Sequence, residues 1–390
     1  MKTNPQAIRV KRVKHLAAAF IGLTARTLFF FRRTPRLSDD FIERTGTILL
    51  IRPEGMGDLI QTLPAIAYLR SIHSNAKIAI LVRPLFAQLA RDLGVFNEVI
   101  SFEYPKRSTF NIAQLRRTLK DFFHLRYRFD LAYDFRGDPR NAIIGAWSAR
   151  AVIGITCKST SFLLSVAEPK NIKLPATMQN LTIVSAGQRL RPSSVEPYET
   201  IFNYQLPEAA VRKAEALTAH LPGYVVVHPM ASRPSNSCSA KKWIVLVKLI
   251  ATGGHPVVLT GAGSRDTAVI EEIIRGAGLQ GRVVSLANQT NPTELAAVIE
   301  RASGLVSPDT GVSHIAYARR IPSVTIFGAA NWERTGYSTP LNQPVHYDPP
   351  CKPCNAFYCP RTDFPMECIE TIQEQDVYDT LMRVMAAKQV

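Results

Sequence analysis

"TILLIRPEGMGDLIQT", residues 47–62, is the stretch of the sequence that decides the fold. It starts with an apolar run, Thr47–Ile51, typical of a buried strand, and from Asp58 its apolar residues recur at helical spacing. A strand that passes through a short glycine-containing turn into a helix is the basic unit of a parallel α/β sheet. The glycines and the aspartate of this turn allow three interpretations: a phosphate cradle, a capped helix, or a catalytic base.

Short apolar runs alternate with helical stretches along the rest of the chain, which predicts parallel sheets covered by helices. In the first half we expect strands at 47–51, 77–82, 98–102 and 129–135, and helices at 58–71, 84–92 and 110–126. A helical stretch at 206–221 leads to a second series, with strands at 223–229, 255–263, 282–287, 304–307 and 322–328, and helices after Lys241, at 265–275, at 292–302 and from Gly311. Ligands of such sheets bind beyond the carboxyl ends of the strands, so the loops that follow strands are the candidate sites.

The positive charge of the chain is concentrated in an N-terminal arm. Nine of the 47 Lys and Arg side chains, and no acid, lie in residues 1–36, which leaves 38 basic against 31 acidic side chains elsewhere. The apolar part of the arm, Leu16–Phe31, is interrupted by Arg26 and is shorter than the ~20 residues that cross a bilayer. No small-residue cleavage site follows, so we do not expect a removed signal peptide.

Apolar side chains of the arm, residues 1–40, recur at helical spacing, with basic side chains on much of the remaining surface. This pattern predicts an amphipathic helix that lies on an anionic membrane surface. The alternative is a basic extension with a few residues packed against the body. Nucleic acid is not expected as a partner, because the basic residues are not interleaved with aromatic platforms along a body surface.

The loop "PEGMGDL" does not match the usual phosphate-binding motifs. A Walker A loop requires Lys and Ser or Thr where Asp58 and Leu59 stand, and the dinucleotide fingerprint requires a third glycine. Asp58 would also repel a diphosphate. Local evidence favours Asp58 as the N-cap of the helix, because Asp is a preferred cap and interacts favourably with the helix dipole.

A second loop, "SPDTGVSHIA" at 307–316, has the properties of an anion site. Thr310 and Gly311 stand at the start of a helix, where backbone N–H groups, a hydroxyl and close backbone approach favour a phosphate. His314 would lie in the first turn, within reach of that phosphate. The alternative is a plain helix start with Asp309 as cap and His314 solvated or packed.

Two further loops could contact a nucleotide. "HPMASRPSNSCSAKKW", 228–243, ends a strand and starts a helix, and Lys241 could neutralise a departing diphosphate. A pair of surface lysines beside a buried Trp243 is an equally good interpretation. In "TGAGSRD", 260–266, Asp266 could accept a hydrogen bond from a ribose hydroxyl, although the loop fails as a dinucleotide fingerprint at that position.

Four of the six cysteines, Cys351, Cys354, Cys359 and Cys368, lie within 18 residues. A Cys-x-x-Cys pair with two more thiols nearby is compatible with structural zinc or iron. A second Cys-x-x-Cys is missing, so reduced structural cysteines are the alternative. Disulfides are not the default in a chain without an export signal.

Taken together, these stretches resemble glycosyltransferase family 9, the heptosyltransferases of lipopolysaccharide core assembly. The matching segments include "ILLIRPEGMGDLIQTLPAIAYLR", "FDLAYDFRGDPRNAIIGAWSARAVIGI", "VVLTGAGSRD" and "NPTELAAVIERASGLVSPDTGVSHIAYARRIPSVTIFG", and the match spans about residues 46–370. The resemblance implies an α/β fold of the GT-B type, with an acceptor-side Rossmann-like domain at 46–205 and a nucleotide-sugar domain at 222–345. A cysteine-rich segment and a final helix that returns to the first domain would follow at 346–390.

The resemblance also implies an inverting transfer, most simply of heptose from ADP-heptose to a lipopolysaccharide core or related glycolipid, with no catalytic metal. Asp58 would be the general base, Lys241 would face the phosphates, and Asp266 would contact the ribose. The nucleotide-diphosphate loop would be formed by Asp309, Thr310, Gly311 and His314. Such an enzyme would be cytoplasmic and peripheral on the inner face of the inner membrane.

Two departures bear on the substrates. Inner-core enzymes carry Ser-Ala-Ile before Gly-Asp, where this chain has Glu54-Gly55-Met56, and the loop after Pro229 lacks the usual glycine. Two other classes of protein share part of the pattern. A bilobal solute-binding protein should carry an export signal, and a catalytically inactive relative would act as a glycan-assembly partner.

Overall fold

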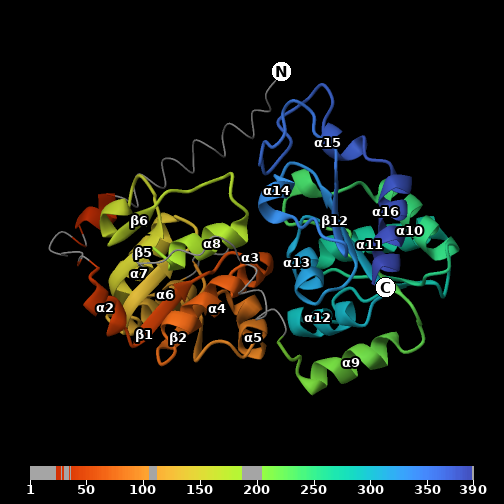
Figure 1. Cartoon of the computed structure of the whole chain (residues 1–390). Helices are drawn as coiled ribbons and strands as arrows, with labels where there is room; N and C mark the ends of the chain where they lie inside the picture. The colour runs from red at the N-terminus through yellow and green to blue at the C-terminus, as the bar shows by residue number, and fades with distance from the viewer. Residues whose placement is uncertain are drawn as a thin grey trace. The chain divides into compact units, whose positions relative to one another are not determined.

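The computed structural model describes residues 23–27, 29, 35, 37–104, 112–186 and 204–388. The chain divides into two compact units, the first ending at Tyr204 and the second starting at Gln205. Each unit contains one six-stranded sheet, all of whose strand pairs are parallel, with helices around it (Figure 1). Both sheets agree with the alternation of apolar runs and helical stretches in the sequence.

The first sheet has the strand order β3-β2-β1-β4-β5-β6. Its strands are β1 (Thr47–Ile51), β2 (Lys77–Val82), β3 (Glu98–Ser101), β4 (Phe129–Asp134), β5 (Ala149–Ile155) and β6 (Val166–Glu168). The helices of this unit are α2 (Asp39–Glu43), α3 (Met56–Ile60), α4 (Leu63–Ile72), α5 (Pro84–Asp92), α6 (Ile112–His124), α7 (Pro139–Ser148) and α8 (Ala176–Val184).

The second sheet has the order β12-β11-β10-β7-β8-β9. Its strands are β7 (Val225–Val227), β8 (Val257–Leu259), β9 (Val283–Ser285), β10 (Gly304–Pro308), β11 (Ser323–Phe327) and β12 (Asn342–His346). The helices are α9 (Glu208–Thr218), α10 (Ala240–Thr252), α11 (Ser264–Ala277), α12 (Pro292–Glu300), α13 (Gly311–Ala318), α14 (Trp332–Thr335), α15 (Glu367–Glu370) and α16 (Glu374–Ala387).

Both sheets have the same topology, in which the first strand of the unit lies at the centre and the fourth lies next to it. The chain winds outward from β1 in one direction and from β4 in the other, and β7 and β10 repeat this arrangement. Neighbouring loops diverge at such a topological switch point and leave a crevice at the carboxyl ends of the strands, where ligands bind. The loops after β1 and β4, and those after β7 and β10, are therefore the positions where a site is expected.

The central strands are apolar on both faces. Ile48, Leu49 and Leu50 of β1 are fully buried, as are the three valines of β7. Helices cover both faces of a parallel sheet, so its inner strands read as continuous apolar runs instead of alternating patterns. This is why β1 matches its predicted range residue for residue.

Two expectations about helices are wrong. The helix expected at 58–71 is two helices, α3 and α4, because Pro64 has no N–H to donate to the Ile60 carbonyl and its ring crowds that group. The final helix α16 does not return to the first unit. Val377, Leu381 and Val384 of α16 belong to the core of the second unit, together with residues of α10, β10 and β11.

The N-terminal arm is described only in part. Residues 23–27 are helical, and Ala25 and Phe29 are buried in a small core with Val152 and Leu163 of the first unit. This part of the arm therefore packs against the body, as the alternative interpretation had it. The remainder of the predicted amphipathic helix lies outside the described residues. Within the described residues, no helix combines the length and the apolar character that crossing a membrane requires.

Candidate functional site

Asp58 lies in the loop after β1, at the switch point of the first sheet. Gly55, with extended backbone, is the N-cap of α3, so Asp58 is the third residue of that helix and not its cap. Its side chain is 41% exposed. A Cβ on Gly55 would lie 3.1 Å from Asp58 Oδ2, which shows how closely the carboxylate approaches the backbone there. The carboxylate is therefore fixed beside the start of the helix and still open to solvent.

Arg52 contacts both the carboxylate and the backbone carbonyl of Asp58. The guanidinium is only 5% exposed, its Nη2 lies 3.5 Å from Asp58 Oδ1, and its Nε donates to the Asp58 carbonyl at 3.1 Å. Thr62 Oγ1 donates to the same carbonyl at 2.7 Å. The two donors fix the backbone of Asp58, and the buried guanidinium pairs with its carboxylate.

A buried polar network connects this loop to the loop after β4. Asn141 Nδ2, on α7, donates to Glu54 Oε1 at 3.1 Å and to Asp134 Oδ1 at 3.0 Å, and Tyr104 donates to Asn141 Oδ1. Asp134 also accepts hydrogen bonds from the backbone N–H groups of Arg136 and Gly137. The amide of Asn141 therefore joins the two loops at the switch point.

Burial sets the protonation of these two carboxyls. It raises the pKa of Asp134 to about 7, against hydrogen bonds that favour the ionised form. Burial also raises the pKa of Glu54, although the nearby guanidinium of Arg52 acts in the opposite direction. Glu54 Oε2 is buried and accepts no hydrogen bond from the described residues, with Arg52 Nη1 3.8 Å away.

In the second unit, the loop after β10 starts α13. Thr310 is the N-cap, and its hydroxyl accepts a hydrogen bond from the Val312 N–H. Asp309 is therefore not the cap, and its carboxylate instead accepts a hydrogen bond at 3.4 Å from Asn236 in the loop after β7. This contact connects the two loops of the switch point of the second sheet.

His314 is buried in the first turns of α13. Its Nδ1 lies 2.9 Å from the hydroxyl of Tyr337, and the two rings meet edge to face. Tyr337 in turn stacks on Tyr317 of the same helix. The orientation of the imidazole is thus set by an aromatic cluster that the sequence did not reveal.

Asp266 lies in the first turn of α11, where its Oδ2 accepts a hydrogen bond from the backbone N–H of Ala262 at 2.9 Å. It therefore shapes the glycine loop after β8. Nearby, His228 Nδ1 lies 3.0 Å from the Thr260 hydroxyl. Burial lowers the pKa of His228 to about 4, although the Asp266 carboxylate favours the charged form. His228 is thus neutral at pH 7 and supplies no positive charge to an anion.

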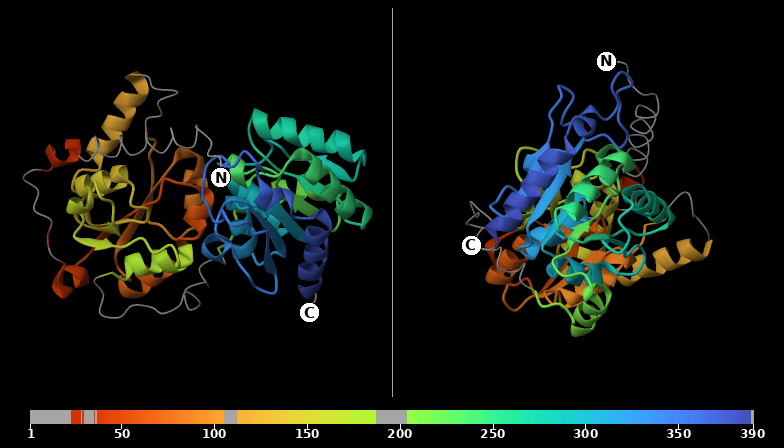
Figure 2. Two further views of the ribbon diagram at one scale, coloured as in Figure 1. Left: turned by 90° about the horizontal axis from the view of Figure 1, so that it is seen from above. Right: turned by 90° about the vertical axis from the view of Figure 1, so that its right-hand side faces the viewer.

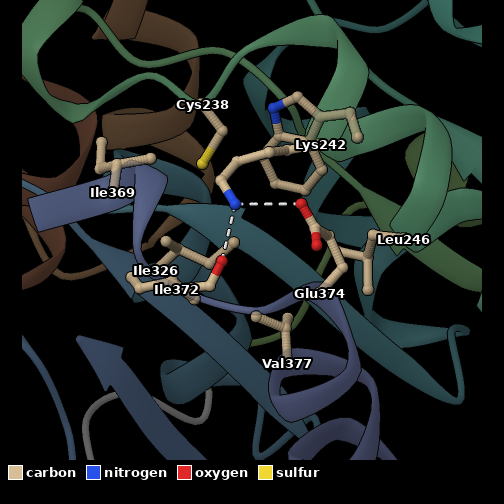
Figure 3. A pocket seen from close by; sticks show the side chains of 9 residues that line it. Cys238, Lys242, Leu246, Ile326, Ile369, Ile372, Glu374 and Val377 are labelled. Carbon is tan, nitrogen blue, oxygen red and sulfur yellow. Dashed lines mark hydrogen bonds and ion pairs between the residues drawn. The ribbon is translucent and has the colours of Figure 1, made fainter. Parts of the chain in front are cut away.

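The adjacent Lys241 and Lys242, on the first turn of α10, have different environments. Lys242 Nζ donates to the Ile372 carbonyl at 2.6 Å and to Glu374 Oε1 at 3.0 Å, across the small apolar cavity shown in Figure 3. Lys242 therefore ties the C-terminal segment to α10. Lys241 is exposed, and no polar side chain among the described residues pairs with its ammonium.

The four clustered cysteines line one small cavity, together with Ser235, Arg361 and Met366. All six cysteines of the chain are free thiols. The Met366 N–H donates to Cys359 Sγ at 3.3 Å, and burial together with the three neighbouring thiols raises the pKa of Cys368 to about 11. No group of three or more His, Cys, Asp or Glu side chains among the described residues is already arranged as a metal site.

The structure thus assembles two separate groups of predicted residues. In the first unit, Asp58 follows the central strand β1 and pairs with Arg52, whose guanidinium also lies 3.8 Å from Glu54, and these two contacts were not predicted. In the second unit the Asp309–His314 loop is joined to the loop after β7 by Asn236, another residue that the sequence did not single out. Arg52 and Glu54 did carry a signal, since charged side chains directly after a buried strand require partners.

The family model that matches this sequence is "Glycosyltransferase family 9 (heptosyltransferase)", over residues 112–362. Lipopolysaccharide heptosyltransferase 1 of Campylobacter coli is 22% identical over 341 residues, which cover 85% of this chain and 96% of that protein.

Solved structures show the same fold. The Escherichia coli ADP-heptose lps heptosyltransferase II superposes with a TM-score of 0.69 at 18% identity, over 88% of this chain and all of that one. The iron-containing dodecameric glycosyltransferase TibC of enterotoxigenic E. coli matches with a TM-score of 0.53 at 14% identity, over 92% of this chain and 79% of that one. These similarities confirm the expected fold class, two Rossmann-like α/β domains of the GT-B type.

Proposed function

Because the chain belongs to glycosyltransferase family 9, we propose that it transfers a heptose from ADP-heptose to a lipopolysaccharide core or a related glycan. The donor and acceptor classes are those in the names of its relatives, which refer to ADP-heptose and to lipopolysaccharide. One observation supports the proposal: the two switch points carry different groups, each suited to one half of the proposed reaction. In the first unit, the half-exposed carboxylate of Asp58 pairs with the buried Arg52. In the second unit, the N-terminus of α13 and the exposed Lys241 follow strands of the sheet.

Asp58 is the proposed general base. Transfer requires that a hydroxyl of the acceptor loses its proton as it attacks the anomeric carbon. The 41% exposure of Asp58 leaves its carboxylate open to such a hydroxyl, and the Arg52 guanidinium pairs with it. A carboxylate is a weak base, which suffices when the sugar carbon is already cation-like and the proton moves late. Attack from the face opposite to the leaving group inverts the anomeric centre.

The departing nucleoside diphosphate is the proposed ligand of the second unit. The N-terminus of α13 presents backbone N–H groups and the positive end of a helix dipole, which favour a phosphate. Lys241 supplies a mobile positive charge without a competing partner among the described residues. Together they would stabilise the charge that develops as the glycosidic phosphate bond breaks, and no catalytic metal is required in this scheme.

The ribose is assigned to Asp266. One oxygen of this carboxylate already accepts the Ala262 N–H, so the role falls to its second oxygen. His314, oriented by Tyr337, is proposed to contact the diphosphate as a neutral or charged donor. The enzyme would act at the cytoplasmic face of the inner membrane, where a soluble nucleotide sugar meets a lipid-linked acceptor.

We also propose that Cys351, Cys354, Cys359 and Cys368 hold one structural zinc or iron ion. Four thiols on one cavity wall form a suitable donor set, and the N–H donated to Cys359 is of the kind that stabilises a metal-bound thiolate. The described sulfurs are not arranged as a metal site, so binding would have to bring them together. Such an ion would tie down a segment that has little regular secondary structure of its own.

A screen of nucleotide sugars tests the proposed function. A ligand that binds only the native state stabilises it and so raises the melting temperature. At a ligand concentration of one hundred times the Kd, the free energy of unfolding increases by ~2.7 kcal/mol. ADP-heptose should stabilise the chain more than UDP-, GDP- or CMP-sugars, and incubation with a lipopolysaccharide core acceptor should then yield a product one heptose heavier. Stabilisation by a different nucleotide sugar would change the donor. Stabilisation without any product would indicate the alternative, an inactive relative that binds glycan precursors.

A further inference from the structure

Helix α6 is attached to the first unit mainly through one end. Phe122 stacks on Trp147 with ring centroids 4.9 Å apart, and Trp147 Nε1 donates to the Phe122 carbonyl at 2.8 Å. Thr118 adds a hydrogen bond to the Glu103 carbonyl at 3.2 Å. The rest of the helix projects from the sheet of its unit, as the orange helix in both views of Figure 2 shows.

The outward side of α6 carries an apolar stripe. Ile112, Leu119 and Phe123 are 68%, 44% and 60% exposed. Positions seven and eleven residues apart lie on the same side of a helix, so the three side chains form one line. Tyr127, three residues after the end of the helix, is also 57% exposed. Single exposed apolar residues are normal on a protein surface, but an aligned set on a projecting helix indicates a contact surface.

Basic side chains surround the stripe. Residues 112–128 contain five Lys or Arg and one acid, Asp121, so the segment has a formal charge of +4. Arg116 and Lys120 are exposed and lie next to the stripe on the helix surface. An apolar line with basic residues on its flank is the arrangement of helices that lie in the interface of anionic membranes.

We propose that α6 is a membrane-docking helix, which inserts Ile112, Leu119 and Phe123 into a bilayer while Arg116 and Lys120 contact anionic headgroups. The charge pattern selects this partner, because basic side chains beside an apolar stripe complement anionic headgroups at the point where the stripe enters the bilayer. The proposal rests on the proposed function in one respect: a lipid-linked acceptor gives the enzyme a reason to lie on this surface.

Vesicle co-sedimentation of the full chain tests the proposal, with phosphatidylcholine vesicles alone and with vesicles that contain phosphatidylglycerol. I112S/L119S/F123S should lower partitioning to the anionic vesicles about tenfold, and R116E/K120E should lower it by about the same factor and weaken its dependence on salt. L85S/I172S is the matched apolar control, because Leu85 and Ile172 are 66% and 65% exposed on the same unit. K173E is the matched charge control, and neither control should change partitioning.

Phe123 also contacts Trp147 edge to face at 5.6 Å, so I112S/L119S is included as a variant that leaves this contact intact. The partitioning of I112S/L119S to anionic vesicles should be about threefold lower than that of wild type, with an unchanged melting temperature. Partitioning equal to wild type in both apolar variants would overturn the proposal, as would a lipid-free dimer that these variants dissociate. Vesicle binding is measured without nucleotide sugar, so the two proposals can fail independently. Loss of the membrane proposal would leave donor binding and transfer to a water-soluble acceptor intact, and loss of the transferase proposal would leave vesicle binding intact.

Discussion

Asp58, the proposed general base, and Arg52 show how single residues could prepare a site for its chemistry. A base must be accessible, yet a flexible aspartate on a surface loop would rarely point at the acceptor. Here a guanidinium with 5% exposure pairs with the carboxylate and also bonds its carbonyl, so that charge and orientation are set by one side chain. Pre-organisation of this kind is what makes a weak carboxylate base useful.

We expect Asp58→Asn to lower turnover by ~10²–10⁴, the usual range for a lost general base. Asn keeps the size of Asp but cannot accept the proton, and the helix cap is Gly55, so stability should change little. Donor binding, measured by thermal shift, should persist because that ligand is assigned to the second unit. Asp92→Asn, at the C-terminal end of α5 in the same unit, serves as the control. Near-normal turnover of Asp58→Asn would require another base.

Lys241 and Lys242 form a matched pair for mutation. Lys241→Ala should raise the Kd for the nucleotide sugar and lower turnover by ~10–100-fold, without loss of stability, because the side chain is exposed. Lys242→Ala should instead lower the melting temperature, because it leaves Glu374 and the Ile372 carbonyl without their donor. Nucleotide titrations and thermal melts of both variants separate these effects. An equal loss of donor binding in both would contradict the assignment.

Glu54 predicts a pH dependence of stability. Its pKa in the fold lies above the ordinary 4.5, so the native state retains a proton that the unfolded chain releases. The free energy of unfolding therefore decreases as the pH rises from the ordinary pKa of 4.5 through the higher pKa of Glu54 in the folded state. Glu54→Gln removes this loss and should gain roughly 2–4 °C over wild type at pH 8, and little at pH 4. Melts across this range, with the exposed Glu43→Gln as control, check the sign, and a gain confined to low pH would refute it.

At the scale of elements, the sequence predicted what depends on local pattern. β1, β2 and α5 have their expected bounds, because each combines an unbroken apolar pattern with a clear start such as the Pro at the first position of α5. Strands β5, β6 and β12 were not predicted. "ARAVIGI" directly follows α7 without a turn, and β12 contains a proline and polar residues at the sheet edge.

The candidate site was predictable to the same extent. Residues that stand directly after a strand, such as Asp58 and Thr310, are visible in the sequence because the topology fixes their position. Partners supplied from far along the chain are not. Asn141 lies 87 residues after Glu54, and Tyr337 lies 23 residues after His314, and no local pattern connects these pairs. The cap assigned to Asp58 failed for a related reason, because any short residue at the turn can fill that position.

The cysteine segment gives a prediction at this scale. If the four thiols hold a metal, elemental analysis should find about one zinc or iron per chain, and removal by a chelator should lower the melting temperature. Binding must displace the proton of Cys368, whose pKa is raised to about 11, so affinity should increase with pH. Cys354→Ser should abolish the metal content and the isolated Cys157→Ser should not. Metal-free protein of unchanged stability would leave the cysteines as reduced structural residues.

At the scale of the whole molecule, charge is distributed unevenly. Nine basic residues lie in residues 1–36, and residues 112–128 add a second cluster of five. Both belong to the half of the chain that carries Asp58, the proposed acceptor side. An acceptor embedded in an anionic membrane would favour this asymmetry, while the proposed donor of the second unit would arrive from solution.

The two proposed membrane contacts, the N-terminal arm and α6, should cooperate. Deletion of residues 1–22 spares Ala25 and Phe29, which belong to the core, and should reduce partitioning to anionic vesicles at low salt. Each contact, once bound, raises the effective concentration of the other at the membrane. The deletion combined with I112S/L119S should therefore lower the affinity for vesicles by more than the intrinsic affinity of the weaker contact accounts for. Co-sedimentation of the two single variants and their combination measures this. Transfer to a water-soluble acceptor fragment should remain intact in all three, and binding that the combination leaves unchanged would place the membrane contact elsewhere.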